Sequence, residues 1–468
     1  MPQARTLVSG APARGADDRQ WKRGKLVSAP SAPPVAPPAA SSPSSAAFRR
    51  PRHGAPVGRG RRRAVGHGVG FWFAAVAFTV LMAFGTEPTP LWPMYQARDG
   101  FGTTTVTVAF AMMIVGATAG FLTLGHLSDR LGRRRIVVPA LAVAIVAALV
   151  YLIWPELPGL LVGRFLNGVG VGLMASTATM YLHDLYQQEH PDRPGSAVPG
   201  VVAAAANLGG LALGPLTAGL IAQWAPHPLT TTQAAFAVAL TVGLVLVLAT
   251  PETVDRSPRA GAGGDRPQRF ALRHGTGAAF AAASALGTFA FALLGVISAL
   301  GAIVIRTKLG IESHIIGGLA PTLMFAASAL GQLALGALPS RRLAATGAMV
   351  FPLGLGLVAL SLHFPTLPLF LVAVSVAGAG AGLLFKSGIG WAGAFAVPAS
   401  RAGVLAVFFT IAYLGMGLPA ILLSVIIRHT SVEATMTGFA VALSVGAVAA
   451  VRVAMRLTEQ RIGTARQG

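Results

Sequence analysis

The sequence predicts an all-α integral membrane protein, with twelve transmembrane helices in two six-helix halves that repeat each other. Charge is scarce: 54% of the 468 residues are apolar and 11% are charged, whereas soluble domains carry about 25% charged residues. Uncharged windows such as 136–154 and 230–250 are long enough to cross a hydrocarbon core of about 30 Å as helices. A polar stretch at 251–275 divides the hydrophobic part of the chain into two nearly equal lengths.

The spans are expected to be helices because lipid offers the backbone no hydrogen-bond partner, and a helix satisfies its own peptide groups. A membrane β-barrel would instead show alternating segments of about ten residues. Trp92 and Tyr95 are expected at the outer membrane interface, and Lys386 at the inner end of the tenth helix. We predict helices at 70–95, 104–125, 136–154, 158–184, 197–222, 230–250, 277–304, 315–337, 343–363, 366–386, 402–427 and 434–456.

The two halves are predicted at 68–250 and 276–457, joined by a polar cytoplasmic linker at 251–275. Residues 1–67 are rich in Pro, Ala, Ser and Arg. Because such a composition cannot bury a core, we expect a disordered basic cytoplasmic tail there. It lacks the apolar region of a signal peptide, and we interpret it as an inert tail or an over-extended start of the reading frame. A second cytoplasmic tail is expected at 458–468.

The formal net charge of +21 indicates membrane orientation rather than nucleic-acid binding. Thirteen of the 36 Lys and Arg residues lie in 1–66, and a further 18 lie in alternate loops and the C-terminal tail. Four lie on the opposite side, and Arg164 lies inside a helix. This asymmetry is the positive-inside pattern, and it predicts a multi-pass plasma-membrane protein with both termini in the cytoplasm. The sequence has no cysteine, which excludes disulfides and thiol chemistry.

A charged loop, Gly-His-Leu-Ser-Asp-Arg-Leu-Gly-Arg-Arg-Arg at 125–135, separates the second and third predicted helices. It matches the G-x-x-x-D-R/K-x-G-R-R/K signature of the major facilitator superfamily, which the chain resembles over residues 68–457. The resemblance implies a transporter of two six-helix halves that works by alternating access. The matching residues are Gly125, Asp129, Arg130, Gly132, Arg133 and Arg134.

Two more motifs in the first half resemble the same family. The stretch RFLNGVG at 164–170 resembles R-x-x-Q-G-x-G, with Asn167 in place of Gln. The stretch GLALGPLTAG at 210–219 resembles G-x-x-x-G-P-x-x-G-G, a pattern that accompanies proton-coupled exporters in the family. The resemblance therefore implies the drug and multidrug exporter branch. A degenerate copy of the charged loop, GALPSRR at 336–342, supports an internal repeat, although Ser340 replaces its acid.

The charged loop is expected to contain a conformational switch. Asp129 and Arg133 are four residues apart, so on a helical turn they share a face and can pair. The resemblance implies a third member at the end of helix four, here Asp184, and implies that Asp129 faces the start of helix eleven near 401–403. This cluster would hold the halves together while the site faces outward. The simpler alternative is that all the loop arginines, Arg130 included, only orient the protein.

Glu87 is the only one of the fifteen acids that lies well inside a predicted helix. A carboxylate there costs about 2.5–3.5 kcal/mol on insertion scales. Because lipid disfavours the ionised form, such a group can bind and release a proton. Glu87 is therefore our leading candidate for proton coupling or for binding a cationic substrate. The alternative is that Pro88 and Pro90 end the helix early and leave Glu87 in the outer water.

Arg164 is the only base well inside a predicted helix, and it must pair with a carboxylate or with helix carbonyls. The resemblance implies a role in proton transfer or in anchoring helix one. We place Arg164 nearer the cytoplasmic side than Glu87 and expect no direct contact between them. Small residues and a proline in helices four and five are expected to pack the helices closely or to seal one side of the pathway. They are Gly168, Gly170, Gly210, Gly214, Pro215 and Gly219.

The function that the sequence favours is proton-coupled export, by antiport, of small amphiphilic or lipophilic compounds. The second half has no acid inside the membrane and few polar groups, which suits an apolar pocket. The first alternative is a proton-coupled importer of a metabolite or sugar, which would need more amide and acid groups. An integral-membrane enzyme would need clustered histidines and acids, but the ten histidines are scattered.

We expect no catalytic residue, no metal and no cofactor, with the proton gradient as the energy source. The expected partners are a small-molecule substrate, protons and the lipid bilayer, without nucleic acid. The protein is expected to be a monomer.

Overall fold

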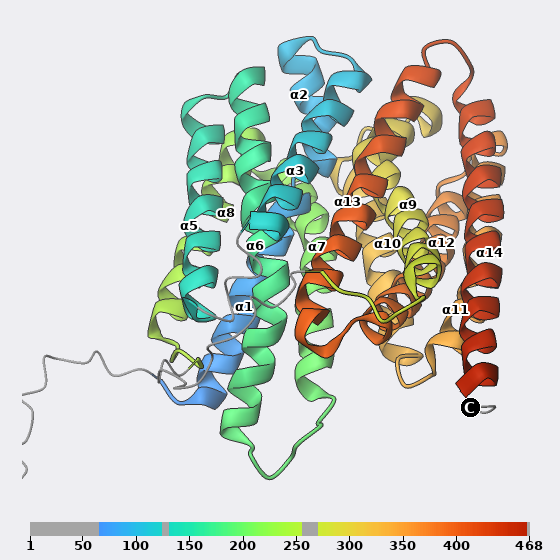
Figure 1. Cartoon of the computed structure of the whole chain (residues 1–468). Coiled ribbons are helices and arrows are strands. Elements are labelled where there is room, and N and C mark those ends of the chain that lie inside the picture. The colour runs from blue at the N-terminus through green and yellow to red at the C-terminus, as the bar shows by residue number, and fades with distance from the viewer. Residues whose placement is uncertain (1–64, 124–130, 255–269, 466–468) are drawn as a thin grey trace, which may run out of the picture. The chain divides into compact units, whose positions relative to one another are not determined.

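The computed structural model describes residues 65–123, 131–254 and 270–465, and residues 60–468 form one compact unit. Twelve helical spans among the described residues are long and apolar enough to cross a membrane (Figure 1). The elements are α1 (His67–Thr86), η1 (Thr89–Leu91), α2 (Trp92–Asp99), α3 (Thr103–Thr123), α5 (Arg134–Ile153), α6 (Leu157–Glu189), α7 (Val198–Trp224), α8 (Pro228–Ala249), α9 (Gly277–Leu309), α10 (His314–Ala334), α11 (Ser340–His363), α12 (Leu367–Phe395), η3 (Pro398–Ser400), α13 (Arg401–Ile426) and α14 (Val432–Ala465).

Successive spans run in opposite directions, so each span has one end at each of the two ends of the bundle. We call the end where α8 stops and α9 starts the linker-side end; it is the lower end in Figure 1. The opposite end, where α2 meets α3 and α9 meets α10, is the far end. The positive-inside pattern of the sequence predicts that the linker-side end faces the cytoplasm.

The twelve predicted spans are all present, but several boundaries differ. The first span is interrupted after Thr86 and resumes through η1 and α2. Helices α6 and α14 extend past their apolar stretches, to Glu189 and Ala465, and α12 continues beyond Lys386 along an apolar run to Phe395. Lys386 therefore does not end its helix: its Nζ donates to the Gln332 carbonyl 2.7 Å away.

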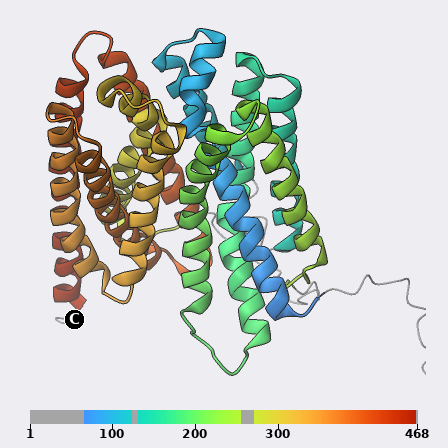
Figure 2. The same cartoon turned by 180° about the vertical axis from the view of Figure 1, so that it is seen from behind.

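Helix pairing in the first half recurs in the second. Helix α1 packs on α7, α3 on α6, and α5 on both α6 and α8. In the same order, α9 packs on α13, α10 on α12, and α11 on both α12 and α14. Figure 2 shows α1, in blue, beside α7, in green. The two halves, which the polar linker joins, thus have the same internal arrangement of six spans.

Glycines explain the closest of these pairings. A Cβ on Gly168 would collide with the Met113 carbonyl of α3, and one on Gly172 with the Ala117 carbonyl. In the second half, Gly378 and Gly382 of α12 lie in the same way against the backbone of α10. Because small residues let backbones approach, these four positions bring the two helices of each pair together.

Two helix pairs join the halves: α3 packs on α13, and α7 packs on α10. At the far end, Thr107 Oγ1 on α3 donates to Ser424 Oγ on α13 at 2.9 Å. Farther from that end, the Phe121 ring stacks on Phe409, with 5.4 Å between ring centroids. The halves are therefore in contact along α3 from its first turns, at Thr107, to its last turn, at Phe121.

Candidate functional site

The first span breaks because of its prolines. Pro88 and Pro90 have no backbone N–H, so they cannot bond the carbonyls of Phe84 and Thr86 as a continuing helix would. The chain passes through η1 and starts again as α2, with Pro93 in its first turn. Non-helical backbone at membrane depth is tolerated only where protein covers it, and this break is buried throughout.

Side chains of α6 supply the donors that the broken helix lacks. Asn167 Nδ2 donates to the Phe84 carbonyl at 2.9 Å, the carbonyl that Pro88 leaves without its helical partner. Arg164 Nη1 donates to the next carbonyl, Gly85, at 3.1 Å. The R-x-x-N pair of the second motif therefore caps the end of α1. The resemblance implied two roles for Arg164. Its hydrogen bond to the Gly85 carbonyl is the contact that anchoring of helix one requires.

Glu87 follows this cap and is fully buried. Its Oε1 accepts a hydrogen bond of 3.0 Å from Gln233 Nε2 on α8. The same Nε2 lies 3.5 Å from the hydroxyl of Tyr95 on α2. The prolines do end α1 early, as the alternative interpretation required, but Glu87 does not face outer water because α2 and α8 cover it.

Arg164 lies close to this carboxyl without pairing with it. Its guanidinium contacts helix carbonyls and Met113 Sδ, at 3.1 Å, and lies 5.9 Å from the Trp92 ring centroid and 6.0 Å from that of Phe110. The prediction that it lies nearer the cytoplasmic side was wrong. Helix α6 starts at the far end, and Arg164 lies in its second turn. Arg164 is therefore at the level of the break in α1.

Trp92 and Tyr95 were expected at the outer interface, but the structure contradicts this. Trp92 is 1% exposed and Tyr95 4% exposed. Their rings pack on each other at 5.9 Å inside the bundle. Both aromatics contact the polar residues around Glu87 instead of lipid head groups: Tyr95 lies beside Gln233 and Trp92 beside Arg164.

We call Glu87, Tyr95, Arg164, Asn167 and Gln233 the buried polar cluster. Four of its buried polar atoms have no hydrogen-bond partner: Glu87 Oε2, Arg164 Nε, Asn167 Oδ1 and Gln233 Oε1. Unpaired buried polar atoms are costly, so each of them requires an explanation, and a functional role is one. All five residues of the cluster belong to the first half, in which α8 packs on α1, α5 and α7.

A second cluster, at the linker-side end, contains the charged loop's described residues. Arg133 Nε donates to Asp184 Oδ2 at 3.1 Å, so this predicted pair is present. The Arg133 backbone N–H also donates to Glu252 Oε1 at 2.8 Å. We call Arg133, Asp184, Glu252 and Thr253 the linker anchor. Thr253 Oγ1 donates to the same Asp184 oxygen at 3.4 Å, so the start of the linker is fixed to the loop and to α6.

Gly132 is required by this cluster. Its φ of 108° lies in a region that side chains rarely adopt. A Cβ there would also lie 2.5 Å from Glu252 Oε2. Arg134 Nη1 donates to the Thr250 carbonyl at 3.0 Å, so this arginine fixes the end of α8 besides adding charge. Gly125, Asp129 and Arg130 lie outside the described residues.

The degenerate second copy of the loop forms a different contact. Arg341, which corresponds to Arg130, pairs with Glu459 on α14, with 2.6 Å between Nη2 and Oε1. Both side chains are exposed, and such surface pairs contribute little to stability. The second half therefore has an exposed ion pair at the same end, where the first half has the partly buried acids Asp184 and Glu252.

The family model named Major Facilitator Superfamily matches residues 71–342, more than half of the chain. The chain belongs to this superfamily. The match includes the buried polar cluster, the linker anchor and the first two spans of the second half. The protein is accordingly a multi-pass membrane transporter, with the all-α, twelve-span fold that the sequence predicts.

Solved structures of transporters share this superfamily fold at low sequence identity. The nucleoside transporter NupG superposes with a TM-score of 0.61 and 11% identity, covering 83% of this chain and 99% of that one. The human organic anion transporter MFSD10 gives 0.62 and 14%, covering 82% and 99%. The POT family transporter PepTSo gives 0.65 and 12%, covering 84% and 98%. At these identities the likeness concerns the fold alone.

Among curated relatives, similarity is local. The glucose transporter GlcP of Staphylococcus epidermidis is 36% identical over 93 residues, which is 20% of this chain and 21% of that transporter. An uncharacterized transporter of Rickettsia bellii is 27% identical over 119 residues, which is 25% of this chain and 29% of that protein. The chain thus matches less than a third of the length of either relative.

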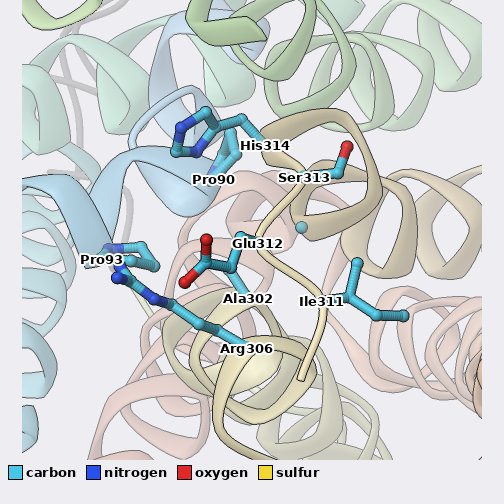
Figure 3. Close-up of a pocket in the computed structure, with 9 residues that line it drawn as sticks. Pro90, Pro93, Ala302, Arg306, Ile311, Glu312, Ser313 and His314 are labelled. Carbon is cyan, nitrogen blue, oxygen red and sulfur yellow. The ribbon is translucent and has the colours of Figure 1, made fainter. Parts of the chain in front are cut away.

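A small cleft lies at the far end of this superfamily member, between the two halves (Figure 3). Pro90 and Pro93 line it from the first half, and Arg306 and Glu312 from the second, with both charged side chains pointing toward the proline side. Beside it, Gln223 Oε1 accepts from Ser313 Oγ at 3.2 Å and from the His314 N–H at 3.1 Å. These contacts close the far end of the interface between the halves.

The motif residues of α7 pack as the sequence suggests. Gly210 and Gly214 lie against the Thr79 and Ala83 carbonyls of α1, and Gly219 against the His314 carbonyl of α10. Pro215 cannot bond the Leu211 carbonyl, and Thr86 Oγ1 donates to that carbonyl at 2.8 Å. Gly170, which packs on the Ala140 carbonyl of α5, completes the set. Gly219 and the Pro215 carbonyl, which lies against Gly318 of α10, contact the other half, where a seal would have to act.

Sequence reasoning missed Gln233 and the direct part played by Glu252. A single amide near the start of an apolar helix forms no recognisable motif, although the free-energy cost of an amide in lipid marks it as a candidate functional residue. Glu252 stands in Pro251-Glu252-Thr253, a run that resembles other superfamily members. Among the described residues, no group of three or more His, Asp or Glu side chains could hold a metal ion.

Proposed function

We propose that this superfamily member is a proton-coupled exporter, by antiport, of small amphiphilic or lipophilic compounds. Glu87 carries the proposal: it is fully buried, one of its oxygens has no partner, and Gln233 holds the other. Among the described residues it is the only buried Asp or Glu. A membrane-embedded acid is costly, and it is retained mainly for proton or substrate handling.

Coupling is expected to act through conformation. The buried polar cluster lies inside the first half, and Arg164 and Asn167 of this cluster hold the end of α1. A change in the charge of Glu87 would alter how this end packs. Since α7, which packs on α1, also packs on α10 across the interface, the change can reach the second half. Direct binding of a cationic substrate to Glu87 does not fit the enclosed carboxyl of this state.

The linker anchor supports the proposed switch at the opposite end. Arg133 and Asp184 are paired, and Glu252 ties the loop to the start of the linker. We propose that Asp129 joins this cluster and contacts the second half when the site faces outward. The cluster would then release that contact as the linker-side end opens.

Glu87→Gln tests the proton-coupling proposal because it keeps the side chain's size and removes the titratable group. In inverted membrane vesicles, proton-driven transport is expected to fall to background, while exchange of labelled for unlabelled compound without a gradient persists. Protein level in the membrane serves as the control for insertion. Undiminished proton-driven transport by this variant would refute the assignment of Glu87.

The second candidate is a proton-coupled importer of a metabolite or sugar. It is favoured by the local similarity to the glucose transporter GlcP, 36% identical over 93 residues. The two candidates differ in direction. An exporter moves compound against its gradient into inverted vesicles when their interior is acidified, whereas an importer accumulates glucose or a related metabolite in right-side-out vesicles with acid outside.

A further inference from the structure

Gln233 has an unusual position for an amide. It lies in the second turn of α8, is 1% exposed, and faces the break in α1. An amide in lipid is costly unless it is bonded, and this one spends its donor on Glu87 Oε1, 3.0 Å away. Nothing in its own helix requires an amide at this place.

The bonding of the pair is incomplete in a particular way. Gln233 Nε2 donates to one oxygen of Glu87, yet Gln233 Oε1 and Glu87 Oε2 both have no partner. Both unpaired atoms are hydrogen-bond acceptors. One belongs to the Gln233 amide and the other to the Glu87 carboxyl, the two groups that already share one hydrogen bond. One added proton on Glu87 Oε2 would provide an O–H donor for Gln233 Oε1. The acid and the amide would then form two antiparallel hydrogen bonds.

An amide suits both states of the carboxyl for this reason. Toward a carboxylate it acts as an N–H donor, and toward a carboxylic acid it is donor and acceptor together. A lysine or arginine would favour the ionised form alone, and an apolar side chain would bond neither form.

We propose that Gln233 is a positioning residue for proton exchange, which pairs with Glu87 through one hydrogen bond when the carboxyl is ionised and through two when it is protonated. The proposal rests on the proposed role of Glu87 in coupling. No atom besides the proton is gained or lost, and the proton comes from water when the cluster opens. Tyr95 on α2 is the other neighbour of the same N–H.

Other titratable groups also act on this carboxyl and must be held constant in the test. They are Arg164 on α6, Tyr95 on α2 and Tyr151 on α5. All three remain in the variants below, so a changed pH profile reports the loss of the amide alone.

The test replaces Gln233 by Met, which keeps the length and removes both polar atoms, and by Asn, which keeps the amide but withdraws it. In Gln233→Met, proton-driven transport is expected to fall about ten- to a hundredfold, the usual effect of losing a buried hydrogen bond to a charged group. The pH profile should change, because the carboxylate loses one donor and the carboxylic acid loses two hydrogen bonds. Gln233→Asn should recover part of the rate.

Infrared difference spectra of the purified protein across pH separate this proposal from the proposed function. The carboxylic C=O band that disappears in Glu87→Gln should shift to higher frequency in Gln233→Met, because its oxygen no longer accepts from the amide. This shift is expected even if Glu87→Gln proves to transport normally. In the double variant, Gln233→Met should add nothing to the effect of Glu87→Gln on transport.

Thr232→Val is the matched control. Thr232 is the neighbouring buried residue of α8, and its hydroxyl has no partner and no bond to Glu87. The pH profile and the carboxyl band should both stay as in the parent protein. An unshifted band together with an unshifted pH profile in Gln233→Met would overturn the proposal, as would equal shifts in Thr232→Val.

Discussion

At the scale of single residues, two prolines have the same effect on the first half. Pro88 leaves the Phe84 carbonyl without a helical donor, and Asn167 supplies one from α6. Pro215 leaves the Leu211 carbonyl free, and Thr86 supplies a hydroxyl from α1. In water, solvent would satisfy such carbonyls, but in lipid only a neighbouring helix can do so. Each break therefore fixes the position of one neighbour.

Asn167→Leu is expected to destabilise the protein because it leaves the Phe84 carbonyl buried and unbonded. The cost of such an orphaned group is about 1–3 kcal/mol. Thermal unfolding in detergent should therefore start at a lower temperature than in the parent. Asn207→Leu is the control, since the Asn207 Oδ1 atom has no partner to lose. Equal melting temperatures for Asn167→Leu and the parent would contradict the capping role.

The residue scale is also where the sequence predicted least. The cost of charge in lipid identified Glu87 and Arg164, and both are buried. Their surroundings could not be predicted, because the direction in which α2 turns after the break depends on packing. Trp92 is of a residue type that is common at membrane interfaces, but it lies inside the bundle. Gln233 carries no motif, and only the fold brings it to Glu87.

At the scale of helices, glycine spacing determines which pairs approach most closely. Gly168 and Gly172 of α6 both lie against carbonyls of α3, and Gly378 and Gly382 of α12 lie likewise against α10. The two pairs occupy corresponding places in the two halves. Close backbone approach is thus a property of the repeat and not of one half.

Gly168→Ala is expected to separate α3 from α6, because the new Cβ would meet the Met113 carbonyl. Overpacking of this kind costs about 1–3 kcal/mol, which a lowered melting temperature would report. Gly209→Ala on α7 is the matched control, since nothing lies within 4 Å of its added Cβ. That variant should be neutral or slightly more stable. Equal melting temperatures for the two variants would refute the packing argument.

Helix number and order could be read from the sequence, because twelve apolar windows and a polar linker leave little choice of topology. The ends could not be placed as well. Helix α14 continues past its apolar stretch to Ala465, where the surroundings no longer need to be apolar, whereas α12 continues beyond Lys386 along the apolar residues 387–395. The break after Thr86 was foreseeable from two prolines, whereas its burial was not.

At the scale of the whole molecule, the contacts between the halves hold the far end closed. Thr107 bonds Ser424 there, and Gln223 bonds Ser313 and His314. In alternating access, these bonds must break when the far end opens. The aromatic contact of Phe121 with Phe409 lies deeper, on the same pair of helices.

A disulfide between Thr107→Cys and Ser424→Cys should arrest transport, because it fixes two positions that must separate. The two side-chain oxygens are 2.9 Å apart, so sulfur atoms in their place lie within reach. The chain has no cysteine of its own, so no other bond can form. Oxidant should stop transport and reductant should restore it, whereas each single-cysteine variant stays active. Full transport by the cross-linked protein would exclude opening at this end.

In the proposed antiport, the single buried acid among the described residues would set an energetic ceiling on the concentration gradient of the transported compound. One exchanging carboxyl carries one proton per cycle, and one elementary charge crossing 100 mV releases about 2.3 kcal/mol. Each 1.4 kcal/mol corresponds to about a tenfold concentration ratio. A neutral compound could therefore be concentrated at most about fiftyfold for each 100 mV of proton-motive force. Steeper gradients would require a second proton site, which the described part of the second half does not contain as a buried acid.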